Sequence, residues 1–450
     1  MKLTREDLGE IAKEFILTDA RKTYVLCGNS LYLKNYDLDD GSTYYIEIDI
    51  EDIKDNVKSV VVILNSVFVL TNSNNLWVCG RNDYGQLGIN IRSTYIVQWT
   101  KITVNGIENN VKSITNNQGS TFLVTLDNNL WVCGRNNYGQ LGTGDLISSF
   151  SWIKITVEGM INNIERVSDI NVSTTLVYTR DKQIFGCGYN NYGTLCSNDI
   201  LNQLYWKKIQ LPPTQIEEID YTIQNNYSLY IITKNKRLFV CGYNGYGQFG
   251  LNTNASVIGE FPVEVADVNI SGKIKKIFVF NYSTYIITDD DTLWTAGLNN
   301  YGQLGLGHTS SRYIFTKTTV PALIGEVDEI ISDSANLYST YLLTKNKELY
   351  VAGRNHVGQL GVGTVSSVVK WTKANLPSLD TDEFSIMNTQ NEVIKIMIQP
   401  GRTFIVTNGL RIYATGDNSN GELMLGDRRN RNSWTFNNLE KIINNYSNKL

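Results

Sequence analysis

Apolar residues in this chain fall in short runs of strand length, and polar turn residues separate one run from the next. Runs such as TFLVT from Thr121 and TYIIT from Thr284 are rich in β-branched and aromatic residues. Runs of this composition, bounded by Gly, Asn and Asp, predict β-strands. The pattern therefore predicts an all-β protein.

One stretch with a glycine turn recurs along the chain. LWVCGRNDYGQLG begins at Leu76, LWVCGRNNYGQLG begins at Leu130, and looser copies follow as far as IYATGDNSNGELMLG from Ile412. The first glycines of the seven copies are Gly80, Gly134, Gly188, Gly242, Gly297, Gly353 and Gly416. Four strand-like runs recur in each period, which is typical of a propeller blade. We predict a single β-propeller of four-stranded blades, in which the repeated turn is structural and not a catalytic loop.

The number of blades depends on how residues 1–56 are interpreted. YIEIDIEDIKDNVKSV from Tyr45 aligns without a gap to WTKITVNGIENNVKSI from Trp99, and TYVLCG at Thr23 to Gly28 is similar to LWVCG. Residues 1–56 are therefore either a degenerate first repeat or an N-terminal appendage, and residues 57–450 form the propeller. MKLTREDLGEIAKEF could alternatively form a short amphipathic helix.

The two ends of the chain suggest how the propeller closes. The C-terminal runs SWTF and LEKIINNYS lack two strands of a unit, and the N-terminal runs FILT and TYVLCG resemble those two strands. A blade shared by the N- and C-terminal strands would leave no open sheet edge. This internal count predicts eight blades, whereas an appendage at residues 1–56 leaves seven.

The repeated G-x-N-x-x-G-Q-L-G turn resembles that of the regulator of chromosome condensation repeat family. The resemblance extends from about Lys58 to Trp434 and implies a seven-bladed β-propeller. It also implies a function, because members include an exchange factor for a small GTPase, a photoreceptor and plain interaction modules. The chain departs from the family before each copy, where segments such as NQGSTF and NYSTYI replace a G-G-x-H-T-like segment and its histidine.

Variable side chains follow the first glycine of each copy, and these are our first candidates for partner binding. The backbone is constant there while the side chain changes, and loops on a rigid scaffold commonly carry function. The arginines among them could together recognise a carboxylate or phosphate group; the alternative is that all are ordinary solvated loop residues. The candidates are Arg81, Arg135, Tyr189, Tyr243 and Arg354, while Leu298 and Asp417 occupy the same position in the other copies.

A second candidate surface is acidic. Between Tyr36 and Asp55 there are eight acidic residues and one lysine, so 8 − 1 leaves a local charge of −7. In IEIDI, the three isoleucines are expected to face the core and the two acids to face outward. The segment is either a charged strand edge that prevents pairing or a docking surface for a basic partner. Its candidate residues are Asp37, Asp39, Asp40, Glu47, Asp49 and Glu51.

Composition and motifs exclude several function classes. The formal charge is −4, so we expect any association with nucleic acid to be indirect. No signal peptide, membrane-spanning segment, metal-binding Cys/His spacing or catalytic motif is recognisable. We therefore expect no catalytic residues, cofactor, metal, membrane contact or small-molecule substrate.

The sequence predicts a non-enzymatic scaffold that binds another protein inside the cell, in the cytoplasm or nucleus. One alternative is a guanine-nucleotide exchange factor for a small GTPase, as the family resemblance implies. Another is a structural component of a large DNA virus particle, because the richness in Asn, Ile, Lys and Tyr suggests an AT-rich genome. In that case the protein would be located in the virion.

Overall fold

The computed structural model of the 450-residue chain describes its repeated sheets and most of the turns between them. The described residues are 2–3, 12–17, 23–27, 29–36, 43–168, 173–213, 218–225, 227–265, 270, 272–280, 282–318, 327–332, 338–376, 392–408 and 411–437.

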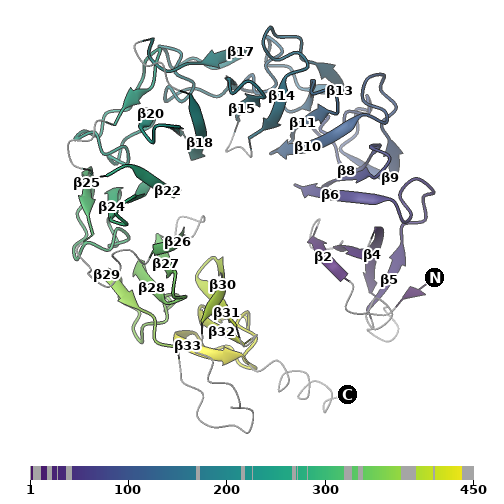
Figure 1. Cartoon of the computed structure of the whole chain (residues 1–450). Coiled ribbons are helices and arrows are strands. Elements are labelled where there is room, and N and C mark those ends of the chain that lie inside the picture. The colour runs from purple at the N-terminus through teal and green to yellow at the C-terminus, as the bar shows by residue number, and fades with distance from the viewer. Residues whose placement is uncertain are drawn as a thin grey trace. The chain divides into compact units, whose positions relative to one another are not determined.

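Seven sheets repeat the same plan of four antiparallel strands in chain order. The second strand of each sheet lies between neighbours on both sides, so its run is buried almost throughout; all six residues of STFLVT at Ser120–Thr125 are buried. The fourth strand is less buried, and in β13 Trp152 is its one buried residue. This difference is why the second strand lacks the alternation expected of a half-buried strand. Figure 1 shows the strands of these sheets following one another along the chain.

The strands of the seven sheets have the following bounds: β6 (Val57–Ile63), β7 (Ser66–Thr71), β8 (Leu76–Arg81) and β9 (Tyr95–Lys101); β10 (Val111–Asn117), β11 (Ser120–Thr125), β12 (Leu130–Gly134) and β13 (Ser149–Lys154); β14 (Ile164–Val167), β15 (Thr174–Thr179), β16 (Ile184–Gly188) and β17 (Gln203–Ile209); β18 (Ile219–Asn225), β19 (Ser228–Thr233), β20 (Leu238–Gly242) and β21 (Val263–Glu264); β22 (Ile274–Phe280), β23 (Ser283–Thr288), β24 (Leu293–Gly297) and β25 (Arg312–Lys317); β26 (Val327–Ser332), β27 (Ser339–Thr344), β28 (Leu349–Gly353) and β29 (Val368–Lys373); β30 (Val393–Gln399), β31 (Arg402–Thr407), β32 (Ile412–Gly416) and β33 (Arg431–Asn437).

The N-terminal segment forms an eighth sheet with five strands, in the order β1-β5-β4-β3-β2. Its strands are β1 (Lys2–Leu3), β2 (Ala12–Leu17), β3 (Thr23–Cys27), β4 (Ser30–Tyr36) and β5 (Thr43–Glu47). β2 carries a register irregularity after its first paired residue, as do the first strands β6 and β10. The segment is thus a degenerate copy of the repeat, in which a short connection replaces the glycine turn.

The predicted blade shared by both termini is wrong. All four strands of the last sheet come from residues 393–437, and all strands of the N-terminal sheet come from residues 2–47. TYVLC is the second strand of its sheet, whereas LWVCG is a third strand, so the alignment of Gly28 with Gly80 is also wrong. The alignment of YIEIDI with WTKITV holds, because β5 and β9 are both fourth strands. LEKIINNYS lies outside the described residues.

The described chain divides into two compact units. The first comprises residues 1–219 and 258–262, with the N-terminal sheet and the sheets from β6 to β17. The second comprises residues 220–257 and 263–450, with the sheets from β18 to β33. The described residues contain no helix long and apolar enough to cross a membrane.

A buried asparagine fixes each glycine turn between the third and fourth strands. In the β12–β13 turn, Asn136 is fully buried; its Oδ1 accepts a hydrogen bond from the Leu141 N–H at 2.9 Å and its Nδ2 donates to the Asp145 carbonyl at 3.0 Å. The same acceptor contact, five residues along the chain, occurs in all seven turns. The asparagine thus pairs buried backbone groups that strand ladders do not reach. The glycine turn is therefore structural, as predicted.

Each turn also packs against the next sheet. At Gly142, an added Cβ would lie 2.3 Å from Nε1 of Trp206 on β17, and Gly305 stands in the same relation to Trp371 on β29. Only glycine leaves room for these indole rings. The tryptophans of these fourth strands thus fill the space between neighbouring sheets within each unit.

Polar contacts join neighbouring sheets in two interchangeable ways. In the first unit, the Thr121 hydroxyl donates directly to the Gln86 carbonyl of the preceding turn at 2.6 Å. In the second unit, the Tyr341 hydroxyl donates to the Gln359 carbonyl at 3.0 Å and lies 2.6 Å from the Thr403 hydroxyl of the next sheet. In the second unit, a tyrosine hydroxyl thus lies between the turn carbonyl and the threonine of the next sheet. The buried turn carbonyl has a hydrogen-bond donor in both arrangements.

Replacing the buried turn asparagine should destabilise its unit. Asn136→Ala leaves the Leu141 N–H and the Asp145 carbonyl without their partner, at a cost of about 2 kcal/mol. Urea unfolding, monitored by tryptophan fluorescence, should show that the first unit, which contains Asn136, unfolds at a lower urea concentration. The exposed neighbour Asn137 supplies the control, and equal midpoints for Asn136→Ala and Asn137→Ala would contradict this role.

Candidate functional site

The backbone of the residue after the first glycine is held by the same two hydrogen bonds in six of the seven copies, while Asp417 shows only the bond from its N–H. The Arg135 N–H donates to the Gly119 carbonyl at 2.8 Å, and the Arg135 carbonyl accepts from the Ser120 hydroxyl at 2.7 Å. Tyr243 is held in the same way by Tyr227 and Ser228. Because the backbone is fixed, substitution at this position changes only the side chain that is presented. That this position carries specificity for a partner stays a prediction.

In the first unit, these side chains form a continuous band with the tyrosines of the turns. The Arg135 guanidinium lies 5.2 Å from the ring centroid of Tyr84 and 6.0 Å from that of Tyr138. Tyr138 in turn meets Tyr189 edge-on at 5.4 Å. We call this set the first turn band; its members are Arg81, Tyr84, Arg135, Tyr138, Tyr189 and Tyr192.

The two arginines of the first turn band differ in how their charge is balanced. Arg81 donates two hydrogen bonds to the Asp83 carboxylate, at 2.9 and 2.7 Å. Arg135 has no ion pair among the described residues, and its Nε is buried without a hydrogen-bond partner. Arg81 and Arg135 are brought together around Tyr84, but Arg135 carries the uncompensated charge.

The second unit presents a band dominated by tyrosine. Tyr243, Tyr246 and Tyr282 surround one another, with centroid distances of 6.1 Å (Tyr243–Tyr246), 5.7 Å (Tyr243–Tyr282) and 4.6 Å (Tyr246–Tyr282). Burial raises the pKa of Tyr282, and the neighbouring tyrosines raise it further. We call these three residues the tyrosine cluster; all are partly exposed.

Arg354 completes the band of the second unit. Its guanidinium lies 5.2 Å from the ring centroid of Tyr301, and Tyr338 stacks on the same ring at 5.4 Å. We call Tyr243, Tyr246, Tyr282, Tyr301, Tyr338 and Arg354 the second turn band. Arg354 belongs to a different unit from Arg81 and Arg135, and joint recognition of an anion by the three arginines stays a prediction.

The sequence analysis missed the tyrosines on which the bands are built. Tyr84, Tyr138, Tyr246 and Tyr301 were read only as part of the repeated turn. Tyr282 and Tyr338 immediately precede a buried second strand, where the sequence analysis noted only a missing histidine. The available signal was the recurrence of tyrosine before the second strand at Tyr227, Tyr282 and Tyr338.

The acidic candidates are only partly described. Asp37, Asp39 and Asp40 lie outside the described residues. Glu47 and Asp49 both lie near Lys54, at 4.0 and 3.6 Å, and Glu51 is exposed. Of these acids, Glu47 lies on β5, which is not a free edge because it pairs with β4 on one side and, at Tyr45 and Ile46, with β1 on the other; the docking surface for a basic partner stays a prediction.

The expected alternation of IEIDI is also incomplete. Ile48 and Ile50 pack on the core near Ile53, as predicted, but Ile46 is 37% exposed. The reason is that β5 ends at Glu47, so the period of two residues does not continue through the segment. Asp52 is structural, since it accepts the indole N–H of Trp77 at 2.8 Å.

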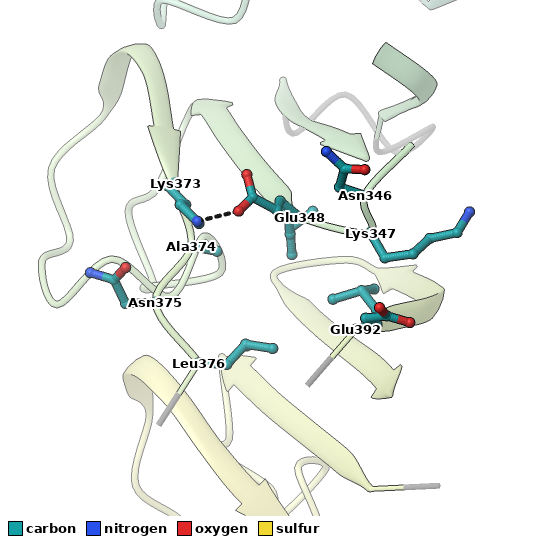
Figure 2. Close-up of a pocket in the computed structure, with 10 residues that line it drawn as sticks. Asn346, Lys347, Glu348, Lys373, Ala374, Asn375, Leu376 and Glu392 are labelled. Carbon is teal, nitrogen blue, oxygen red and sulfur yellow. Dashed lines mark hydrogen bonds and ion pairs between the residues drawn. The ribbon is translucent and has the colours of Figure 1, made fainter. Parts of the chain in front are cut away.

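A polar cavity of about 640 Å³ opens beside the β27–β28 hairpin of the second unit. Figure 2 shows Lys373 and Glu348 pointing toward each other at its wall. Lys347 pairs with Asp328 at 3.0 Å, and Glu392 accepts a hydrogen bond from Asn408. Because its charged side chains are already paired, we do not take this cavity as the functional site.

The described part of the chain contains no group of His, Cys, Asp and Glu residues that could hold a metal ion. Cys133 and Cys187 are buried, and burial raises the pKa of both thiols well above the usual range. They pack as small apolar residues. The chemistry that the bands offer is therefore recognition through cation–π contacts, ion pairs and hydrogen bonds.

The comparisons with known proteins agree with this fold. Residues 290–333 match the model of the regulator of chromosome condensation (RCC1) repeat. The chain is 24% identical over 285 residues to the ultraviolet-B receptor UVR8 of Arabidopsis thaliana, which covers 63% of this chain and 62% of that protein. It is 36% identical over 125 residues to the secretion-regulating guanine nucleotide exchange factor of Bos taurus, which covers 28% of this chain and 26% of that protein. Each match covers less than two thirds of the relative's length.

A solved structure, that of Kap60 bound to yeast RCC1 (Prp20), matches with a TM-score of 0.50 at 14% identity, covering 81% of this chain and 83% of that chain. The repeated four-stranded sheets and their glycine turns define this chain as a repeat protein of the β-propeller class. One of its repeats, at residues 290–333, matches the regulator of chromosome condensation (RCC1) repeat, and the chain is similar to proteins that carry such repeats.

The Arg81–Asp83 pair should contribute less to the stability of the fold at acid pH. Burial pushes the pKa of Asp83 up, but hydrogen bonds from Arg81 and Gln86 and the charge of Arg81 outweigh it, so the pKa lies below the ordinary 3.8. A carboxyl whose pKa is lowered by folding adds stability above its ordinary pKa and loses it as the pH falls through the folded pKa.

Arg81→Gln should therefore raise the pKa of Asp83, as measured by carboxyl ¹³C NMR with Asp83→Asn used for assignment. Asp427, whose pKa is lowered by its own contact with Arg431, provides the internal control and should not change. An unchanged Asp83 pKa in Arg81→Gln would show that the guanidinium does not hold the carboxylate.

Proposed function

We propose that this protein is a non-enzymatic scaffold that binds another protein through its turn bands. The observation that carries the proposal is Arg135, which is stacked on two tyrosines and has no ion pair among the described residues. A charge held in a fixed position without a partner costs desolvation energy that a binding partner can recover. Tyrosine and arginine are also the residues most enriched at the energetic centres of interfaces.

The rigidity of the turns supports the same proposal. The band residues that lie in the glycine turns stand on a backbone held by a buried asparagine and by the contact of the residue after the first glycine with the start of the second strand. A surface fixed in this way loses little conformational entropy when a partner binds. The first turn band, with Arg135 at its centre, suits an acidic segment of the partner.

Affinity capture from the native source tests the proposal. Arg135→Glu reverses the uncompensated charge and should reduce recovery of the partner about tenfold, since a charge at the centre of an interface is costly to reverse. Lys154→Glu reverses an exposed charge on β13 outside the band and should leave recovery unchanged. Equal loss in both variants, or no protein enriched by the unaltered chain, would refute a scaffold that uses this band.

Guanine-nucleotide exchange is a second candidate function, favoured by the 36% identity over 125 residues to an exchange factor. Exchange requires only that the protein bind a GTPase better in its nucleotide-free state. Under the scaffold proposal, the purified protein should leave nucleotide release unchanged across a panel of small GTPases carrying a fluorescent GDP. Release accelerated tenfold or more for one GTPase would instead establish the exchange function.

A further inference from the structure

The repeat places an arginine over a turn tyrosine in each unit. Arg135 lies 5.2 Å from the centroid of Tyr84, and Arg354 lies 5.2 Å from that of Tyr301. In both cases the arginine follows the first glycine of one turn, and the tyrosine belongs to the turn of the preceding sheet. The chain thus shows, at two places, that this turn tyrosine accepts a cation on its ring.

Tyr246 occupies the same position in its turn, but the following sheet supplies Leu298 in place of arginine. Leu298 is 3% exposed and contributes no charge. The aromatic surface at this place is at the same time enlarged, because Tyr243 and Tyr282 complete the tyrosine cluster at 6.1 and 4.6 Å from Tyr246. Three tyrosine rings therefore lie together at a place where Leu298 stands in the position that arginine occupies at Arg135 and Arg354.

Three tyrosine rings at these distances suit one kind of ligand group. Aromatic rings carry negative charge on their faces and attract ammonium and guanidinium groups, most strongly where the cation is partly desolvated. Tilted and edge-on packing leaves ring faces directed at different sides of a shared space; Tyr246 and Tyr282 are tilted by 40°, and Tyr243 and Tyr246 by 69°. The group that the cluster suits is a lysine or arginine head.

We propose that the tyrosine cluster of Tyr243, Tyr246 and Tyr282 binds a lysine or arginine side chain from a basic segment of a partner protein. This inference rests on the proposed scaffold function and specifies the chemistry of one of its surfaces. The two turn bands then select opposite charges: the first, through Arg135, selects an acidic segment, and the second selects a basic one.

Peptide binding measured by fluorescence anisotropy tests this inference. The probe is a fluorescein-labelled peptide with two arginines among glycine and serine residues, and its control carries citrulline, which keeps the shape of arginine without the charge. The arginine peptide should bind about 3- to 10-fold more tightly than the citrulline peptide, as expected for partly desolvated cation–π contacts. Equal affinity for the two peptides would overturn the proposal.

Three substitutions identify the site. Tyr246→Phe keeps the ring and should keep the affinity, whereas Tyr246→Leu removes the ring and should abolish the preference for arginine over citrulline. Leu298→Arg supplies the cation that Arg135 and Arg354 provide at the equivalent position and should weaken peptide binding by occupying the ring. Circular dichroism and the thermal midpoint confirm folding of each variant, with Tyr205, which is 70% exposed on β17 of the first unit, replaced by leucine as the matched control.

The outcomes separate this inference from the proposed function. Unchanged arginine preference in Tyr246→Leu, or no binding of either peptide, overturns the tyrosine cluster as a cation site, while partner capture through Arg135 is judged independently. A single-stranded oligonucleotide that binds where the arginine peptide does not would also overturn the proposal, because it would indicate base stacking.

Discussion

The interaction on which this structure depends is the hydrogen bonding of one buried asparagine in each glycine turn. Asn136 and its six counterparts accept a backbone N–H five residues ahead, in a place where no strand partner is available. This contact allows a long connection between the third and fourth strands to be as fixed as the strands themselves. The turn in turn brings its last glycine against an aromatic side chain of the next sheet, so that Gly142 seats Trp206. The packing between neighbouring sheets therefore depends on the hydrogen bonds within each turn.

A fixed backbone leaves function to the side chains that it presents. The N–H after the first glycine makes the same backbone hydrogen bond in every turn, yet the residue is arginine, tyrosine, leucine or aspartate. In the first unit the result is a band in which Arg135 retains an unbalanced charge. In the second unit Leu298 replaces the arginine, and the tyrosines gather without it. The same backbone therefore presents a charged side chain at Arg135 and an apolar one at Leu298.

Most of the fold could be predicted from the sequence because the residues that form each strand and turn recur in every repeat. The four runs per period and the glycine turn specify strands and connections locally, so the seven regular sheets followed from the pattern. The N-terminal sheet was misaligned because TYVLCG is similar to a third strand by composition, while its place as a second strand is set by pairing with β2 and β4. The prediction of a blade shared by the two termini was wrong for the same reason, because composition does not show which strands pair.

The candidate site was predicted only in part. Variation after the first glycine identified Arg81, Arg135, Tyr189, Tyr243 and Arg354, but not which charges are balanced, because the Arg81–Asp83 pair depends on side-chain geometry. Tyr282 was not predicted, because it joins the tyrosine cluster through its contact with Tyr246 of a neighbouring sheet, and such a contact does not show in the sequence.

The claim that a partner binds at the turn bands is tested most directly by site-specific photo-crosslinking. A benzophenone amino acid replaces Tyr189 in the first turn band or, as a control, Tyr205, which is 70% exposed on β17. The account predicts that the captured partner is crosslinked from position 189 and not from position 205. Crosslinking from position 205 alone would contradict it.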